Sequence, residues 1–448
     1  MNSRLAARAP AGPGSGMPVS AAAVRRPPPR FAVHAAMALH DAMLRVADRM
    51  MPAHTAVLQH AHQFAKAHLL SSVAELGIAE HLASGPKDAS ELGRLTGCDP
   101  GSLHRALRAA AVFGVVRLDR RGRFHTTRLL RQLRSADPGR AADWCRYIGS
   151  AAQQAAWTAL SHSILTGDSA FRSIHGCSSF EWFAAHPAEG RQFNSGIAGL
   201  TAAEAPLIAG AYPFPDAAVV CDIGGGTGAL LAEVLCRHPR SRGILVETAN
   251  VLAEAAPFLR AAGIADRVEL AEGDIFGEVC GTADIYLLKW VLHDWDDATC
   301  EAILRTIGTA MPGGAKLVVI EGVQDRNSPH PRFSMIDLQM LVATDGGRER
   351  SVSQLLHLIS AAGFQPRRTR RTATDLVLLE AIKPQPAPGR DRARAPSWAP
   401  VRAALTATPG RTQNSRLWRS PDHPAGNQVA VHSGGSSASR GAEIGDGL

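Results

Sequence analysis

The chain has 448 residues, of which 45% are hydrophobic, so it can form two domains with sizeable cores. Its formal net charge of +8 would suit an acidic partner such as nucleic acid, but the excess lies at the ends. Residues 1–53 contain seven Arg and two Asp, and residues 384–448 contain eight Arg and four acidic residues, which leaves the middle of the chain nearly neutral. No run of 18 apolar residues occurs, which argues against a membrane span.

The two ends are predicted to be disordered, at least in part. Residues 1–50 are rich in Ala, Pro, Gly and Arg and lack the apolar segment of a secretory signal, although residues 31–50 could form a short helix that packs on the first domain. Residues 384–448 form a tail of similar composition without an apolar period. The seven cysteines occur singly, which fits the reduced thiols of a cytoplasmic enzyme better than disulfides or a zinc site.

Residues 51–150 have the pattern of a winged helix-turn-helix. Asp99 or Ser102 is expected to cap the last helix of this domain, because both side chains accept hydrogen bonds from the free N–H groups of a helix start. The expected elements are helices at residues 57–76, 89–97 and 102–113, followed by two short paired strands at residues 115–118 and 124–126.

Two functions fit such a domain. It could bind DNA as part of a regulator that senses a ligand through its second domain. Basic side chains would then contact phosphate groups, namely Arg105, Arg108, Arg120, Arg121 and Arg123. It could instead be a scaffold that buries a face against a second subunit. The nearly neutral charge of the middle of the chain favours the scaffold.

A glycine-rich loop follows a strand at residues 219–223. Asp222, Gly224, Gly226 and Gly228 lie in the sequence VVCDIGGGTG, which is typical of a buried strand that turns sharply into a helix beneath a nucleotide-like ligand. The loop also fits the dinucleotide pattern G-x-G-x-x-G/A, with Glu247 where a ribose-binding acid is expected. An NAD enzyme is therefore a first alternative.

Polar residues end the strands that come next. Residues 243–247 end in Glu247, a third apolar run ends in EGDIF at residues 272–276, and residues 283–289 lead into WVLHDW. Because the carboxyl ends of parallel strands meet at one edge of a sheet, these residues are expected to surround one ligand. The pattern predicts an α/β fold with a mostly parallel, doubly wound sheet.

Four motifs together resemble one family. DIGGGTG, EGDIF, LKWVLHDWDD and GGRERS are similar, in order and spacing, to the class I S-adenosylmethionine-dependent methyltransferases, and specifically to plant and bacterial small-molecule O-methyltransferases of the caffeic acid and acetylserotonin type. The resemblance covers about His54 to Lys383. It implies a homodimer, a winged-helix dimerisation domain at residues 51–150 that is helical apart from its wing, linking helices at 151–205, and a Rossmann-like catalytic domain at 206–383.

The resemblance also implies the cofactor site. S-adenosylmethionine would lie on the glycine loop, with its ribose on Glu247, where relatives usually have Asp, and its adenine near Asp274. The implied cofactor contacts come from Thr201, Asp222, Gly224, Gly225, Gly226, Gly228, Glu247, Asp274, Ile275, Phe276 and Lys289.

Methyl transfer to an oxygen needs a base. A phenol titrates near pH 10, so about one molecule in a thousand is ionised at pH 7. His293, with an ordinary pKa near 6.5, is the candidate base, and Glu321 and Glu349 match the two catalytic acids of the family. An aliphatic alcohol is far less acidic, so a phenolic or enolic hydroxyl is the expected methyl acceptor.

The acceptor pocket and the role of metal are implied in the same way. The acceptor would contact Phe193, Asn194, Ile197, Trp290, Met340 and Thr344, with Ile197 in place of the usual Met. No metal is expected, because the family works by acid-base chemistry and Asp294, Asp296 and Asp297 are expected at a helix start. A related enzyme that hydroxylates or decarboxylates a polyketide remains an alternative. Nucleic acid is not an expected substrate, because no N/D-P-P-Y/F motif occurs.

Overall fold

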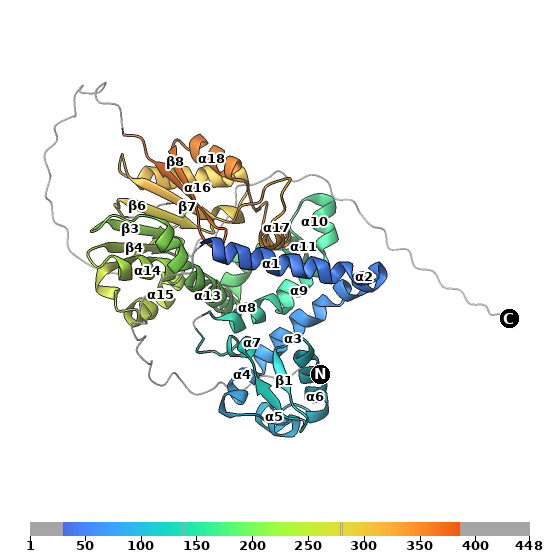
Figure 1. Ribbon diagram of the computed structural model, residues 1–448. Helices are drawn as coiled ribbons and strands as arrows, with labels where there is room; N and C mark the ends of the chain where they lie inside the picture. Colours follow the sequence, from blue (N-terminus) through green and yellow to red (C-terminus); the bar gives the residue numbers. More distant parts are fainter. Residues whose placement is uncertain (1–29, 138, 278, 280, 386–448) are drawn as a thin grey trace, which may run out of the picture. The chain divides into compact units, whose positions relative to one another are not determined.

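The computed structural model describes residues 30–385 except 138, 278 and 280 (Figure 1). Of the two ends predicted to be disordered, residues 1–50 and 384–448, the parts at 1–29 and 386–448 lie outside the described residues. The elements before the first linking helix are α1 (Arg30–Arg49), α2 (Ala53–Ala61), α3 (Gln63–Glu75), α4 (Ile78–His81), α5 (Ala89–Thr96), α6 (Pro100–Val112), β1 (Val116–Leu118), β2 (Phe124–Thr126) and α7 (Arg128–Arg131).

The elements expected of the first domain are present in order, with one difference. Asp99 caps α6 by accepting a hydrogen bond from the Ser102 N–H at 2.8 Å, and β1 pairs antiparallel with β2. The predicted helix at residues 57–76 is instead two helices, which meet at His62. The His62 imidazole contacts the Leu58 carbonyl oxygen at 2.7 Å, so the side chain competes there for a helix acceptor.

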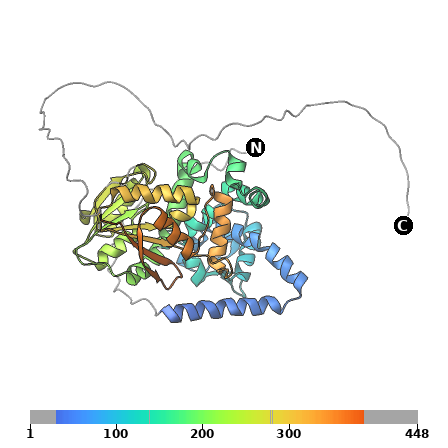
Figure 2. The same ribbon diagram turned by 90° about the horizontal axis from the view of Figure 1, so that it is seen from above.

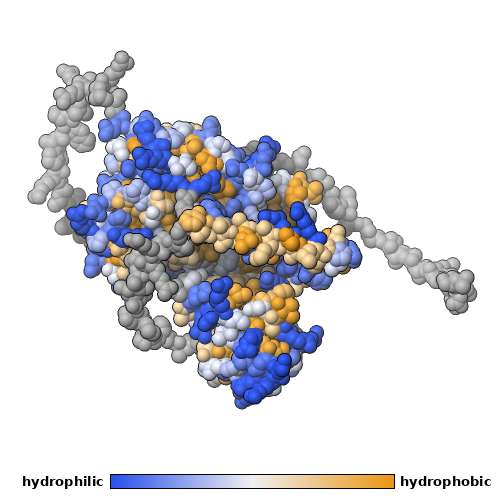
Figure 3. Space-filling model, in the orientation of Figure 1, coloured by the Kyte–Doolittle hydropathy of each residue, from blue (hydrophilic) through white to orange (hydrophobic). Residues whose placement is uncertain are grey.

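The helix expected near residues 31–50 is present as α1. One of its side chains forms an ion pair with the catalytic domain rather than with the first domain. His34 lies 3.1 Å from Asp375, in the turn between two strands of the catalytic domain. Pro52 is extended and separates α1 from α2, where the chain bends (Figure 2). Many apolar side chains of α1 are exposed, and they form a band across the surface in Figure 3, among them Phe31, Leu39, Met43, Leu44 and Val46.

Six helices link the first domain to the sheet. They are α8 (Ala141–Ile148), α9 (Ala151–Thr158), α10 (Leu160–Thr166), α11 (Ala170–His175), α12 (Ser179–Ala185) and α13 (Pro187–Ala211). Within the region 151–205, where linking helices are expected, residues 157–162 and 179–197 are helical but interrupted, at Ala159 and at His186. Pro187 explains the second interruption, because a residue before proline avoids the helical conformation.

A seven-stranded sheet forms the centre of the catalytic domain. Its order is β5-β4-β3-β6-β7-β9-β8, and all pairs among the first five are parallel, whereas β9 is antiparallel to both neighbours. The strands are β3 (Val219–Ile223), β4 (Arg242–Glu247), β5 (Val268–Glu272), β6 (Ile285–Lys289), β7 (Lys316–Glu321), β8 (Gln365–Arg371) and β9 (Val377–Ile382). The strand order reverses beside β3, which is where such sheets bind ligands.

Helices cover both faces of this sheet. The core on one face contains apolar residues of α13, α14 (Ala229–Arg237) and α15 (Ala249–Ala261), and that on the other contains residues of α16 (Asp297–Ala310) and α18 (Val352–Ala361). The helix between them, α17 (Pro331–Ala343), contacts α9 and α11 of the linking region. Among the described helices, none is both long and apolar enough to cross a membrane.

Candidate active site

The glycine loop after β3 has the backbone that its sequence predicts. Gly224, Gly226 and Gly228 have φ of 64°, 60° and 80°, a region that favours glycine. A Cβ on Gly225 would lie 2.5 Å from the Asp222 carboxylate, so the loop is packed tightly onto the strand end. A Cβ on Gly226 would meet nothing within 4 Å, so this side of the loop is open to a ligand.

Unpaired and buried polar atoms surround the loop. Asp222 is 1% exposed, and its Oδ2 atom and the Thr227 hydroxyl have no hydrogen-bond partner. Burial raises the pKa of Asp222 to about 7. Glu247 accepts hydrogen bonds from the N–H groups of Gly226 at 2.9 Å and Thr248 at 3.0 Å, so the longer acid reaches the loop. The unpaired Asp222 oxygen, the Thr227 hydroxyl and the Glu247 carboxylate fit a ligand with an amino acid end and ribose hydroxyls.

Lys289 ends β6 inside a buried cluster of charges. Its ammonium group donates to the Thr201 hydroxyl at 3.1 Å and pairs with Glu204, also at 3.1 Å. Glu204 binds Arg332 of α17 as well. Burial lowers the pKa of Lys289, and the Glu204 carboxylate opposes this effect. Glu204 and Arg332 are not evident from the sequence, because they lie on helices far from the strand-end motifs.

The three residues expected near the adenine lie in the loop after β5. Asp274 accepts a hydrogen bond from the Phe276 N–H at 2.9 Å, which shapes the loop. Ile275 packs against the core, while Asp274 and Phe276 are exposed. The Phe276 ring contacts the Trp295 ring edge-on, with centroids 4.9 Å apart. The loop thus presents a carboxylate and an aromatic ring at the same sheet edge as the glycine loop.

His293 lies in a short 3-10 helix, η3 (Leu292–Asp294), directly after β6. Trp290, which leads into this helix, has φ of 55°, a strained conformation for a bulky residue. The centroid of its ring lies 4.7 Å from that of the His293 imidazole. His293 Nδ1 contacts Glu349 Oε1 at 2.9 Å, and Nε2 lies 3.5 Å from Asp294 Oδ1. Both imidazole nitrogens therefore face a carboxylate.

The two glutamates expected to hold the imidazole do different things. Glu349 contacts the ring, whereas Glu321 accepts hydrogen bonds from the backbone N–H groups of Leu292 at 2.9 Å and Val291 at 3.2 Å. Glu321 thus holds the turn that carries His293. The second carboxylate oxygens of Glu321 and Glu349 are buried without a partner.

These acids change the basicity of His293. Burial alone would lower the pKa of His293, but the carboxylates of Asp294, Glu349 and Glu321 raise it to about 9. Burial in turn raises the pKa of Glu321 to about 7 and that of Asp294 to about 6. Asp294 therefore belongs to this buried cluster and not to a helix start. Asp296 is the residue that caps α16, by accepting from the Thr299 N–H at 2.7 Å.

Arg350 fixes the backbone on both sides of His293. Its guanidinium donates to the carbonyl oxygens of Leu292 at 2.7 Å and Trp295 at 2.6 Å, and to Asp297 at 2.8 Å. The residue is only 2% exposed. GGRERS contains this arginine, but only the structure reveals that it reaches back to the turn. The loop of Glu349 and the turn of His293 are thereby held together.

The residues expected to contact the acceptor lie on α13, just after β6, and on or just after α17. Phe193 packs against the rings of Tyr147 and Phe183, with centroids 5.0 and 4.8 Å away. Thr344, just after α17, donates its hydroxyl hydrogen to the Met340 carbonyl at 2.7 Å, and both residues are buried. Asn194 and Ile197 are partly exposed on α13.

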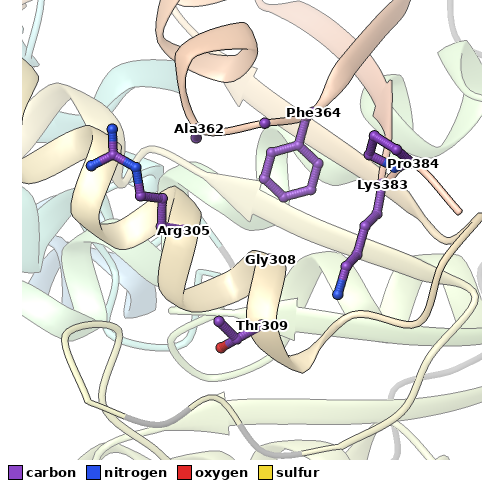
Figure 4. A pocket seen from close by; sticks show the side chains of 8 residues that line it. Arg305, Gly308, Thr309, Ala362, Phe364, Lys383 and Pro384 are labelled. Atoms are coloured by element: carbon purple, nitrogen blue, oxygen red, sulfur yellow. The ribbon is translucent and has the colours of Figure 1, made fainter. Parts of the chain in front are cut away.

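A separate pocket lies at the opposite end of the sheet. Figure 4 shows it between α16 and the end of β9, and its lining includes Arg305, Phe364 and Lys383. Lys383 pairs with Ala315 just before β7 begins, so the pocket is at the amino ends of the parallel strands. None of the residues assigned above to the site lines it.

Comparisons with known proteins agree with this geometry. The model of the O-methyltransferase domain matches residues 157–365, and that of the O-methyltransferase dimerisation domain matches residues 58–133. Phenazine O-methyltransferase PhzM of Lysobacter antibioticus is 37% identical over 308 residues, which make up 69% of this chain and 90% of that protein. Aclacinomycin 10-hydroxylase RdmB of Streptomyces purpurascens is 33% identical over 302 residues, or 66% and 80% of the two chains.

Solved structures show the same relationship. The crystal structure of LaPhzM has a TM-score of 0.72 and 36% identity, covering 74% of this chain and all of that one. CalO1, a methyltransferase of calicheamicin biosynthesis solved with SAH bound, has a TM-score of 0.64 and 31% identity, covering 74% and 99%. The sequence of the glycine loop is compatible with either NAD or S-adenosylmethionine as the cofactor. These matches identify the cofactor as S-adenosylmethionine. The chain belongs to the O-methyltransferase family and is an S-adenosylmethionine-dependent O-methyltransferase.

Proposed function

We propose that the enzyme methylates a phenolic or enolic hydroxyl of a small secondary metabolite, with His293 as the general base. The contact between His293 Nδ1 and Glu349 carries this proposal, because it fixes the imidazole with Nε2 available to a proton. Glu321 acts on the turn backbone, and Asp294 lies beside Nε2. A base of fixed orientation at the end of β6 would thus lie next to the glycine loop.

The raised pKa of His293 suits a weakly acidic acceptor. An ordinary histidine is about 3.5 pKa units less basic than a phenolate, whereas a pKa of about 9 reduces that difference to about one unit. Proton transfer from a phenol to the neutral imidazole is then close to balanced. The carboxylates that raise the pKa also stabilise the imidazolium that forms.

The remaining site residues are proposed to bind the cofactor and the acceptor. S-adenosylmethionine supplies an activated methyl group when bound. The glycine loop would hold its amino acid end, Glu247 its ribose, and Asp274 with Ile275 and Phe276 its adenine, while Lys289 and Thr201 support the loop side of the site. The acceptor would contact Phe193, Asn194, Ile197, Trp290, Met340 and Thr344.

We further propose that catalysis needs no metal. Near His293, Glu349 contacts the imidazole, Glu321 accepts from backbone N–H groups, and Asp297 pairs with Arg350, so each of these acids has a partner other than a metal cation.

We also propose that the enzyme is a homodimer. A homodimer is supported by the match to a dimerisation domain and by exposed apolar residues of α2, α3 and α6, namely Val57, Leu58, Phe64 and Val112. Sedimentation velocity should show a dimer; a monomer at micromolar concentration would contradict this. Neither nucleic acid nor membrane is required as a partner.

The function is tested with labelled S-adenosylmethionine and a panel of phenols, naphthols and hydroxyquinolines, with and without a chelator. We expect methyl transfer to at least one aromatic hydroxyl, unchanged by the chelator. Transfer only to aliphatic alcohols, or its loss with the chelator, would contradict the proposal.

Hydroxylation of a polyketide is the second candidate, because RdmB is among the relatives. Mass spectrometry of the product distinguishes the two reactions, since methylation adds CH₂ and hydroxylation adds one oxygen. We expect the CH₂ increment with no requirement for O₂.

A further inference from the structure

A buried glutamate on α13 binds two cations at the end of β6. Glu204 is only 4% exposed. Its carboxylate pairs with the Lys289 ammonium group at 3.1 Å and with the Arg332 guanidinium at 2.5 Å, and it accepts from the Trp290 indole N–H at 3.4 Å. Among the residues that the structure describes, no other carboxylate lies within 4.0 Å of the Lys289 ammonium group. One negative charge therefore faces two positive charges.

These charges lie beside the glycine loop. Leu288, the residue before Lys289, pairs with Ile223, the residue before Gly224, where β6 and β3 run parallel. Two residues after Lys289, the Cγ2 atom of Val291 lies 3.2 Å from where a Cβ on Gly224 would be. The segment that carries Lys289 therefore runs along the start of the loop.

Glu204 stays charged in this setting. Burial would raise the pKa of its carboxyl, but the charges of Lys289 and Arg332 lower the pKa below its ordinary value. The carboxylates of Asp222 and Glu321 also act on Lys289, but from beyond 4.0 Å. Without Glu204, two cations would adjoin the loop with no carboxylate in contact, and little water screens them because the Lys289 side chain is only 8% exposed. A further positive charge brought to the loop would then be repelled.

The methyl donor brings such a charge. S-adenosylmethionine has a positive sulfur, whereas S-adenosylhomocysteine, which remains after methyl transfer, has a neutral one. We propose that Glu204 offsets the charges of Lys289 and Arg332 and thereby raises the affinity of the enzyme for its cationic cofactor relative to the neutral product. Product inhibition is reduced as a result. The inference rests on the placement of the cofactor on the glycine loop proposed above, and it involves no residue of the acid-base cluster.

The test measures binding and not turnover. Calorimetry gives the affinity of both ligands for the parent enzyme and for Glu204→Gln, which loses the charge but keeps an oxygen for the Trp290 indole. The ratio of the Kd of S-adenosylmethionine to that of S-adenosylhomocysteine should rise about tenfold, because only the first ligand has the extra charge. Sinefungin, with a protonated amine at the position of the sulfonium, should follow S-adenosylmethionine. A merely structural role of Glu204 would weaken all three ligands equally.

Further variants test the sign of the effect. Arg332→Met removes one of the two cations, so the same ratio should fall, and combining it with Glu204→Gln should return the ratio to near the parental value. Glu189→Gln is the matched control and should leave the ratio unchanged. Glu189 also lies on α13 and accepts from an indole, that of Trp182 at 3.1 Å, but pairs with no cation among the described residues.

Two results would overturn the inference: an unchanged ratio in Glu204→Gln, or a ratio that moves in the same direction in Glu204→Gln and Arg332→Met. If Glu204→Gln does not fold, Arg332→Met decides by itself, since an unchanged ratio there would show that the charge of this cluster does not act on the ligand. Failure of both ligands to bind the parent enzyme would instead contradict the proposed cofactor site.

Discussion

At the scale of single residues, the proposed chemistry depends on three carboxylates that lie around His293, of which Glu349 and Asp294 face the imidazole and Glu321 holds the turn backbone. Sequence motifs identified His293, Glu321 and Glu349, and the structure brings all three together. Their individual geometry was not predictable, because a motif gives residue type and order but not which oxygen meets which donor. Asp294 shows the same limit, since next to a helix start it resembles a capping residue, yet it is half-buried beside Nε2.

The raised pKa of His293 predicts the pH dependence of the reaction. The charged imidazolium is favoured up to pH of about 9, so the neutral base is about one part in a hundred at pH 7 and increases tenfold per pH unit. We therefore expect kcat/KM for a simple phenol to rise until about pH 9. A profile that becomes flat near pH 6.5 would show that the carboxylates do not act on His293.

Replacing the two glutamates should separate their roles. Glu349→Gln removes a charge that touches the imidazole, so it should lower turnover by roughly 10 to 10²-fold and move the rising part of the pH profile to lower pH. Glu321→Gln keeps an oxygen that can accept from Leu292 and should cost less. Pre-steady-state rates across pH check both; a larger loss in Glu321→Gln would contradict the assignment.

At the scale of secondary structure, the sequence predicted the strands better than the helices. The expected strands at residues 219–223 and 243–247 correspond to β3 and β4, because a buried strand is a short apolar run between turn residues. The long apolar period at residues 57–76 continues across His62, so it does not reveal the break. Pro187 was a usable signal for the break at His186.

Arg350 couples two elements that the sequence keeps separate. Arg350→Met would leave the Leu292 and Trp295 carbonyls without their buried donor, and we expect a loss of roughly 3 kcal/mol in unfolding free energy together with lower turnover. Arg348→Met is the matched control, because Arg348 pairs with the same Asp297 from an exposed position and should change stability by less than about 1 kcal/mol.

Urea denaturation and cofactor calorimetry on both variants check this prediction. In Arg350→Met, kcat should fall more than cofactor affinity, and Arg350→Lys should recover only part of the loss because lysine has no fork of donors. Equal stability of the two methionine variants would show that Arg350 does not hold the turn.

At the scale of the whole molecule, the fold and family were predictable from four motifs, because strand-end residues of a parallel sheet converge on one site. What the sequence could not give is the set of contacts made across long separations. Glu204 with Lys289, Gln153 with Gln339, and Arg350 with Leu292 join segments that carry no shared pattern. The domain boundaries stay predictions.

The basic ends are predicted to be dispensable for catalysis. Deleting residues 1–29 and 386–448 should change melting temperature and turnover little, since these segments have little periodic apolar sequence. Extending the deletion to residue 50 removes α1 and its ion pair from His34 to Asp375, which should cost no more than about 1 kcal/mol. A large loss of stability in calorimetric scans of the longer deletion would show that α1 is a structural part of the enzyme.

If His293 removes the acceptor proton, its loss should matter most for acceptors that still carry that proton. His293→Ala is assayed with an ordinary phenol and with a nitrophenol that is already ionised at the assay pH, both chosen from acceptors of the parent enzyme. We expect a loss of roughly 10² to 10⁴-fold on the phenol, a much smaller loss on the nitrophenol, and unchanged affinity for S-adenosylmethionine. Methylation of the phenol at the parental rate, or an equal loss on both acceptors, would contradict it.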